Sequence, residues 1–128
     1  MESLSSETKS LALDILYDIQ SAIERLQERT EKIYDIDDFL GSSDGMILLD
    51  AVCMLLIAIG ESLKNLDKVT EGKLLPTYPS IPWKQIKGMR DKIGHGYVTV
   101  KMNDVWDTAI EDIKPLKDYC QQIINDNK

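Results

Sequence analysis

Arg90 and His95 are the two residues of this chain whose types and spacing best suit chemistry on a phosphodiester. His95 is the only histidine, and histidine takes up and releases protons near neutral pH, as metal-free cleavage of RNA requires. Arginine offers a permanently charged, bidentate clamp for a transition-state phosphorane. A helix rises about 7.5 Å over five residues, which an arginine side chain can span. Both side chains can therefore address one phosphodiester.

The residues around His95 also bear on this chemistry. Asp91 lies one helical turn before the histidine, where its carboxylate can orient the imidazole through one ring nitrogen. Gly94 and Gly96 flank the ring and leave it unshielded, and Tyr97 follows. A lone histidine is more often a surface residue or a satisfied core residue than a catalyst, and that alternative stays open.

Arg90 breaks the apolar pattern of its own segment. At 100° per residue, Trp83, Ile86, Met89 and Ile93 define one apolar face, and Arg90 falls within it. An arginine on such a face is unfavourable unless a carboxylate or a phosphate satisfies its five donors. An internal salt bridge, or a guanidinium that reaches solvent along its stem, explains the position without any catalytic role.

The rest of the chain predicts long amphipathic helices joined by short breaks. Pro115 should bend or split the last helix rather than abolish it. The sequence therefore predicts an all-α bundle of four or five helices, in a single domain over residues 1–128. The expected segments are a helix over 7–32, a linker with a short helical turn over 35–45, a central helix from 43 or 44 to 66, a crossover loop over 67–82, a helix from 80–82 to 94–96, and a last helix with Asn103 as its N-cap.

The charge distribution limits which ligands are plausible. Hydrophobic residues make up 43% of the chain and charged residues 29%, which is normal for a soluble globular protein. The net charge of −7 argues against indiscriminate binding of nucleic acid. Residues 81–101 hold five basic residues and one acidic residue, a net +4, which leaves −11 for the rest. This predicts a local basic surface on an acidic body, able to accept a polyanion at one place.

Several features point away from membranes, metals and cofactors. No secretory or transit signal is visible, and the most apolar segment, residues 46–60, is too short to span a bilayer. We therefore expect a cytoplasmic protein with no membrane partner. Cys53 and Cys120 lack CxxC spacing and predict buried free thiols. Because there is no glycine-rich phosphate loop and no Cys/His cluster, we expect neither a cofactor nor a metal.

Other candidates have a simpler structural explanation. Glu61 lies opposite the apolar stripe of its helix and is expected to be solvated, with a role in a cleft or an interface as the alternative. Lys87 and Lys92 are typical of a solvated face, although they can also guide RNA toward the motif. Trp83 and Trp106 are expected to pack in the core or between helices rather than stack on bases.

The segment Arg90–Tyr97, RDKIGHGY, has the form R-x4-H-x-Y and resembles the active-site signature of HepT-like toxins of the HEPN superfamily. Residues 78–119, with IPW before the motif and VWDT after it, resemble the C-terminal half of that family. Residues 55–66, LLIAIGESLKNL, are similar to its second helix, and residues 14–26 resemble its first. The resemblance thus covers nearly the whole domain.

The resemblance implies a HEPN helical bundle that dimerises and acts as a metal-independent endoribonuclease, the toxin of a type VII-like toxin–antitoxin system. Arg90 would be the phosphate clamp, His95 the acid–base catalyst, and Asp91 the auxiliary polar residue. RNA would be cleaved and DNA spared, because DNA lacks the 2′-OH. The usual partner is a nucleotidyltransferase antitoxin that transfers AMP to the motif tyrosine, here Tyr97.

One departure from the family pattern affects the motif itself. Many members carry asparagine after the motif arginine, whereas this chain has Asp91. An added negative charge near the phosphate can lower activity, and a carboxylate there can equally hold His95. Two alternatives to the nuclease remain: a non-catalytic binding partner of a nucleotidyltransferase, and a purely structural bundle in which Arg90 is salt-bridged.

Overall fold

The structure is a computed structural model, and it describes residues 4–96 and 101–128. Its first helix, α1 (Ser6–Arg29), follows the amphipathic pattern predicted for residues 7–32. The hydroxyl of Ser5 caps this helix by accepting a hydrogen bond from the backbone N–H of Thr8, which satisfies one of the free donors of the first turn. The buried residues lie three or four positions apart on one face: Ala12, Leu16, Ile19, Ile23 and Leu26.

The short helical turn predicted after the first helix is α2 (Ile36–Leu40). A capping box begins it: the Asp35 side chain accepts from the N–H of Asp38, and the Asp38 carboxylate accepts from the N–H of Asp35. Phe39 is fully buried, and its ring meets that of Trp106 edge-on with centroids 6.2 Å apart. The linker is thereby anchored to the C-terminal part of the chain.

The central helix, α3 (Ser43–Val69), extends three residues beyond the predicted end at Leu66. Ser42 caps it by accepting from the N–H of Gly45. By length and composition alone, the whole of α3 is long and apolar enough to cross a membrane, although its most apolar part, residues 46–60, is shorter than a span. This is weak evidence for a membrane span, because the core helix of a bundle has the same properties. Here the buried side of α3 packs against α1 and α4.

A crossover then leads from α3 to the helix that carries the motif. It passes through Gly72, whose φ of 71° glycine adopts without steric cost, and a 3₁₀ turn, η1 (Leu75–Thr77). Helix α4 (Trp83–Gly96) follows Pro82, whose carbonyl accepts from the N–H of Ile86. The predicted apolar face of this helix is confirmed, since its four members are buried: Trp83, Ile86, Met89 and Ile93.

The last part of the chain is one helical run that changes geometry in the middle. Helix α5 (Met102–Trp106) passes into a π-helical segment, η3 (Asp107–Asp112), and then into α6 (Ile113–Asp126). Pro115 accounts for a break here, because proline has no N–H to donate and its ring clashes with the carbonyl four residues back. The predicted split at Pro115 thus takes the form of a π-helical segment just before it.

The prediction that Asn103 is the N-cap of this run is wrong. Helix α5 begins at Met102, with Lys101 in the N-cap position and no side-chain cap. The carbonyl of Lys101 already accepts hydrogen bonds from the N–H groups of Asp104 and Val105. Asn103 therefore lies inside the first turn, where its side chain cannot act as the N-cap.

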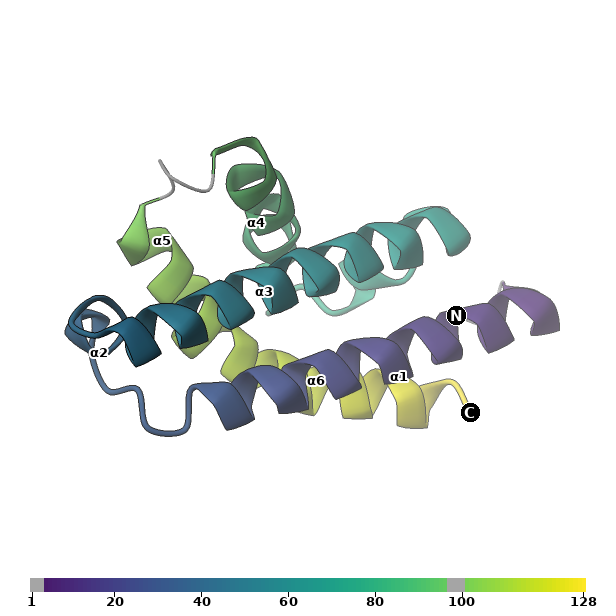
Figure 1. Ribbon diagram of the computed structural model, residues 1–128. Coiled ribbons are helices and arrows are strands. Elements are labelled where there is room, and N and C mark those ends of the chain that lie inside the picture. The colour runs from purple at the N-terminus through teal and green to yellow at the C-terminus, as the bar shows by residue number, and fades with distance from the viewer. Residues whose placement is uncertain (1–3, 97–100) are drawn as a thin grey trace.

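Figure 1 shows α3 running through the middle of the molecule, with α1 along one side and α4 and α5 on the other. The most extensive packing joins α3 to α1 and to α4, and α6 packs along α1. If the run from α5 to α6 is counted as one helix, the described ranges form five helices and contain no strand. The all-α bundle predicted from the sequence is confirmed.

The cysteines and tryptophans take the structural places predicted for them. Cys53 and Cys120 are buried free thiols. Burial raises the pKa of Cys53 to about 11 and that of Cys120 to about 12, so both stay protonated at neutral pH. Trp83 is buried, and its indole N–H donates to the carbonyl of Tyr78 at 2.8 Å. Trp106 packs against α2, so both tryptophans serve in packing.

Candidate active site

Arg90 lies where α4 packs tightly against α3, and Gly60 on α3 makes room for it. A Cβ added at Gly60 would lie 2.9 Å from the Cβ of Arg90 and 3.3 Å from the carbonyl oxygens of Ile86 and Lys87. The two helices therefore approach each other more closely than any residue with a side chain would allow. The Arg90 side chain remains 43% exposed. Its stem packs on α3, while its guanidinium reaches solvent.

Two carboxylates hold the guanidinium at this surface. The Nε–H of Arg90 donates to Oε2 of Glu61 at 2.8 Å, and Nη1 donates to Oδ1 of Asp91 at 3.1 Å. These contacts with Asp91 and Glu61 raise the pKa of Arg90, so it stays charged. Both simple explanations of its position hold in part, because the guanidinium is ion-paired and it also reaches solvent. It is not locked inside the bundle.

Glu61 comes from α3, and its side chain is 51% exposed. It lies on the solvent side of that helix, as predicted, and its carboxylate is directed to Arg90. A carboxylate at hydrogen-bond distance from the clamp residue fixes the direction in which the guanidinium points. Glu61 is therefore part of the structural surroundings of Arg90.

Asp91 pairs with cations rather than with the histidine. The Nζ of Lys64 on α3 lies 3.0 and 2.9 Å from the two carboxylate oxygens of Asp91, and Arg90 donates to one of them. Lys64 and Arg90 together lower the pKa of Asp91, so it is a carboxylate at neutral pH. Both Asp91 and His95 are among the described residues, and no hydrogen bond joins them. The expectation that Asp91 orients the imidazole is not met in this structure.

His95 is exposed in the last turn of α4. Five residues at 100° each place it about 140° around the helix axis from Arg90. The imidazole is accessible to a ligand, but the two side chains leave α4 in different directions. Tyr97, the predicted site of modification, lies outside the described residues.

The lysines around the motif do not form the open basic surface expected from the sequence. Lys87 forms an ion pair with Asp67 of α3, and the Nζ of Lys92 lies 3.6 Å from Asp104 of α5. Lys92 also borders an acidic hollow, whose lining includes Asp104, Asp107, Glu111 and Asp112. Neighbouring helices therefore supply one carboxylate for each of these two lysines. The net charge of residues 81–101 alone did not reveal this pairing.

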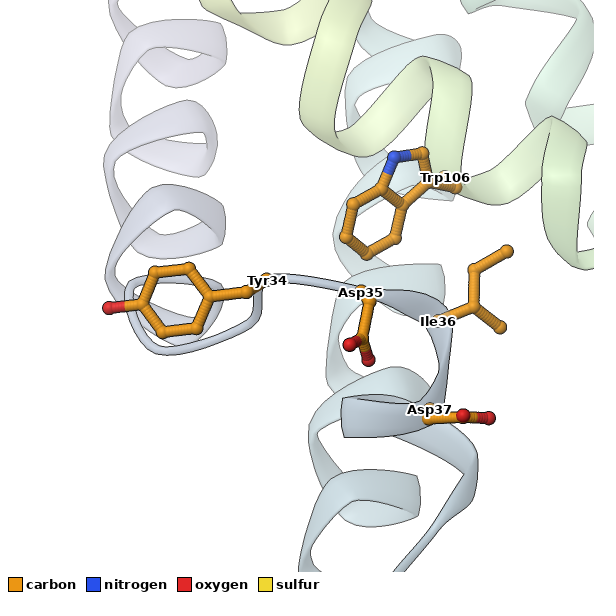
Figure 2. A pocket seen from close by; sticks show the side chains of 5 residues that line it. All are labelled: Tyr34, Asp35, Ile36, Asp37 and Trp106. Atoms are coloured by element: carbon orange, nitrogen blue, oxygen red, sulfur yellow. The ribbon is translucent and has the colours of Figure 1, made fainter.

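A pocket elsewhere in the fold has the wrong charge for a phosphate. Figure 2 shows it between the residues leading into α2 and the ring of Trp106 from α5. Asp35 and Asp37 contribute carboxylates to it, which repel polyanions. It lies beside the start of α3, whereas Glu61 is 16 residues beyond Gly45, or about 24 Å along the helix. This pocket is therefore separate from Arg90.

Sequence reasoning missed Gly60 and Lys64. Both lie within one turn of Glu61 on the same helix, so their spacing places them near one another. What the spacing does not reveal is that this turn of α3 meets α4 at Arg90 and Asp91. Within residues 4–96 and 101–128, no group of three or more His, Cys, Asp or Glu side chains is arranged to hold a metal ion.

The structure is an all-helical bundle in which Arg90 and His95 of one helix are both accessible to solvent, and these side-chain types can bind and cleave phosphodiesters. The model of a family described as "Ribonuclease HepT-like" matches residues 19–123 of this chain. The chain belongs to this HepT-like ribonuclease family, and its fold is the HEPN-type bundle of that family.

Curated relatives carry matching names. A protein of Thermococcus cleftensis named "probable ribonuclease HepT" is 39% identical over 86% of this chain and 93% of its own length. A "putative RNase" of Methanocaldococcus jannaschii is 35% identical over 87% of this chain and 89% of its own length. Another "putative RNase", from Caldanaerobacter subterraneus, is 32% identical over 89% of this chain and 91% of its own length. No solved structure matches the chain significantly.

Proposed function

We propose that this protein is a metal-independent endoribonuclease, the cytoplasmic toxin of a type VII-like toxin–antitoxin pair, with Arg90 and His95 as its catalytic residues. The family and the names of its relatives support ribonuclease activity. The observation that carries the assignment is the surface guanidinium of Arg90. Two of its five N–H donors contact Glu61 and Asp91, which leaves donors on the exposed side for a phosphate.

In the proposed reaction, His95 removes the proton from a ribose 2′-OH as that oxygen attacks the adjacent phosphorus. The O2′–P bond forms and the P–O5′ bond breaks, giving a 2′,3′-cyclic phosphate and a free 5′-OH. Arg90 stabilises the negative charge that develops on the phosphorane. The leaving 5′-oxygen needs a proton, and the proton donor is the partner subunit's His95.

This mechanism requires a homodimer, and α3 offers a surface for the second copy. Ile47 is 62% exposed and Met54 is 67% exposed. They lie seven residues apart, which puts them on one face of the helix, and Glu61 lies seven residues further along that face. A second copy bound there would lie beside Arg90. Dimerisation would thereby bring together arginine and histidine side chains, since Arg90 and His95 point about 140° apart within one copy.

Replacing Met54 with glutamate should convert the dimer to a monomer, because a charge would be buried in an apolar interface. Sedimentation velocity measures the mass of the assembly, and RNA cleavage should fall as the dimer is lost. Leu11→Glu serves as the matched control, since Leu11 is a similarly exposed apolar residue on α1. A wild-type monomer at assay concentration, or a Met54→Glu protein that stays dimeric, would contradict the proposed interface.

The proposed partner is a nucleotidyltransferase antitoxin that transfers AMP from ATP to the hydroxyl of Tyr97 and releases pyrophosphate. Its support is the R-x4-H-x-Y motif, in which Tyr97 is the tyrosine. Co-expression with the nucleotidyltransferase, followed by mass spectrometry of the Tyr97 peptide, should detect one added AMP. An unmodified tyrosine together with silenced nuclease activity would reject this mode of inhibition.

The nuclease assignment is tested by incubating the purified protein with an RNA and with a DNA of the same sequence, in EDTA. The RNA should be cut to products ending in 2′,3′-cyclic phosphate, and the DNA should stay intact because it lacks the nucleophile. His95→Ala protein purified in parallel reveals any contaminating nuclease. Equal RNA cleavage by both preparations, loss of cleavage in EDTA, or cleavage of the DNA would reject the proposal.

A further inference from the structure

Four charged side chains form an alternating row where α3 meets α4. Glu61 contacts Arg90, Arg90 contacts Asp91, and Asp91 contacts Lys64, with N–O distances between 2.8 and 3.1 Å. Glu61 and Lys64 are three residues apart on α3, so they lie on neighbouring turns of one face. Arg90 and Asp91 are adjacent on α4. The close approach of the two helices at Gly60 brings the pairs together.

The two positive and two negative charges of this row cancel, and Lys64 supplies the second positive charge. Without the lysine, two carboxylates would surround one guanidinium, and the cluster would carry a net charge of −1. With it, the cluster is neutral. Lys64 reaches both oxygens of Asp91, whereas Arg90 reaches one. Much of the hydrogen-bonding capacity of Asp91 is therefore directed to Lys64 rather than to Arg90.

The carboxylate of Asp91 and the phosphate of an RNA compete for the same guanidinium. The carboxylate is planar and the phosphate is tetrahedral, and both are oxyanions that accept hydrogen bonds from neighbouring N–H groups of arginine. Asparagine at this position would compete weakly because it has no charge. A carboxylate competes strongly unless another cation occupies it.

We propose that Lys64 is a positioning residue for RNA binding: it occupies the Asp91 carboxylate and thereby keeps the Arg90 guanidinium available to a phosphate. This inference rests on the proposed function, since it concerns the same site. It assigns to Lys64 a role through Asp91, without direct contact between Lys64 and the RNA.

The test is a double-mutant cycle of Lys64→Met and Asp91→Asn, with binding measured to a 2′-O-methyl oligoribonucleotide that cannot be cleaved. Lys64→Met should weaken binding about tenfold, because Asp91 then sequesters Arg90. The double variant should bind as well as Asp91→Asn alone, because no carboxylate remains to be neutralised. Lys68→Met, on an exposed lysine one turn further along α3, should bind like the wild type.

A second measurement does not depend on RNA. Lys64 is the largest contributor to the lowered pKa of Asp91. Carbon NMR titration of the Asp91 carboxyl should therefore give a higher midpoint in Lys64→Met than in wild type or in Lys68→Met. If Lys64 were purely structural, Lys64→Met would lower Tm, and adding Asp91→Asn would not restore RNA binding.

The outcomes separate the two proposals. If Lys64→Met binds as the wild type does, or if the double variant binds as weakly as Lys64→Met, the role of Lys64 is overturned. The second of those results would indicate direct contact between Lys64 and RNA. If the wild type binds the oligonucleotide and the cycle behaves as expected but unmodified RNA is not cleaved, the nuclease proposal fails and the role of Lys64 stands. A wild type that does not bind RNA overturns both.

Discussion

Replacing His95 with alanine is expected to lower the rate of RNA cleavage by about 10²–10⁴-fold, the usual loss when a general acid–base group is removed. The imidazole is exposed in the last turn of α4, where a ligand can reach it. No other histidine is present in the chain to take over proton transfer. Single-turnover cleavage of an end-labelled RNA measures the effect.

This loss must come from chemistry and not from unfolding. Because His95 is exposed, His95→Ala should keep the Tm of the wild type. Added imidazole should restore part of the cleavage rate by replacing the missing base. Gln85→Ala, a change at another exposed position of α4, should leave the rate unchanged. A His95→Ala protein that cleaves RNA at the wild-type rate would remove His95 from the mechanism.

Replacing Gly60 with alanine is expected to lower the free energy of unfolding by about 1–3 kcal/mol, the usual cost of overpacking. The new Cβ would lie 2.9 Å from the Cβ of Arg90 and 3.3 Å from two backbone carbonyl oxygens, so α3 and α4 must move apart. The cost of this overpacking outweighs the gain of about 0.5–1 kcal/mol from replacing glycine with alanine in a helix. Urea denaturation measures the change.

Gly88→Ala is the matched control for this substitution. A Cβ at Gly88, also in a helix, meets nothing within 4 Å. Only the helix-propensity gain applies there, so this variant should be more stable than the wild type by about 0.5–1 kcal/mol. Gly60→Ala should also cleave RNA more slowly, because it displaces Arg90 from Glu61. If the two glycine variants were equally stable, the tight contact at Gly60 would be disproved.

Most of the fold was predictable because helices are specified locally. The three- and four-residue spacing of apolar side chains indicated α1, α3 and α4, and Pro115 marked the break in the last run. The error at Asn103 has a local cause as well: the helix starts two residues earlier than predicted, so a good capping residue falls inside the first turn. The apolar side of α4 was predicted residue by residue.

The surroundings of the site were less predictable, because they depend on contacts between distant parts of the chain. The partner of Arg90, Glu61, lies 29 residues away, and the partner of Asp91, Lys64, lies 27 residues away. The basic segment looked like an open positive surface until α3 and α5 supplied carboxylates for Lys87 and Lys92. Charge counted along a sequence does not show which charges become neighbours.

The sequence by itself determined the helices, the apolar faces, and the presence of one arginine and one histidine at the end of a single helix. These follow from side-chain type and from spacings within a few turns. Tertiary structure decided that Arg90 reaches solvent, that Glu61 holds it, and that Lys64 rather than His95 takes the Asp91 carboxylate. The physical reason is the close approach of α3 and α4 at Gly60, which depends on how two helices pack and not on either helix alone.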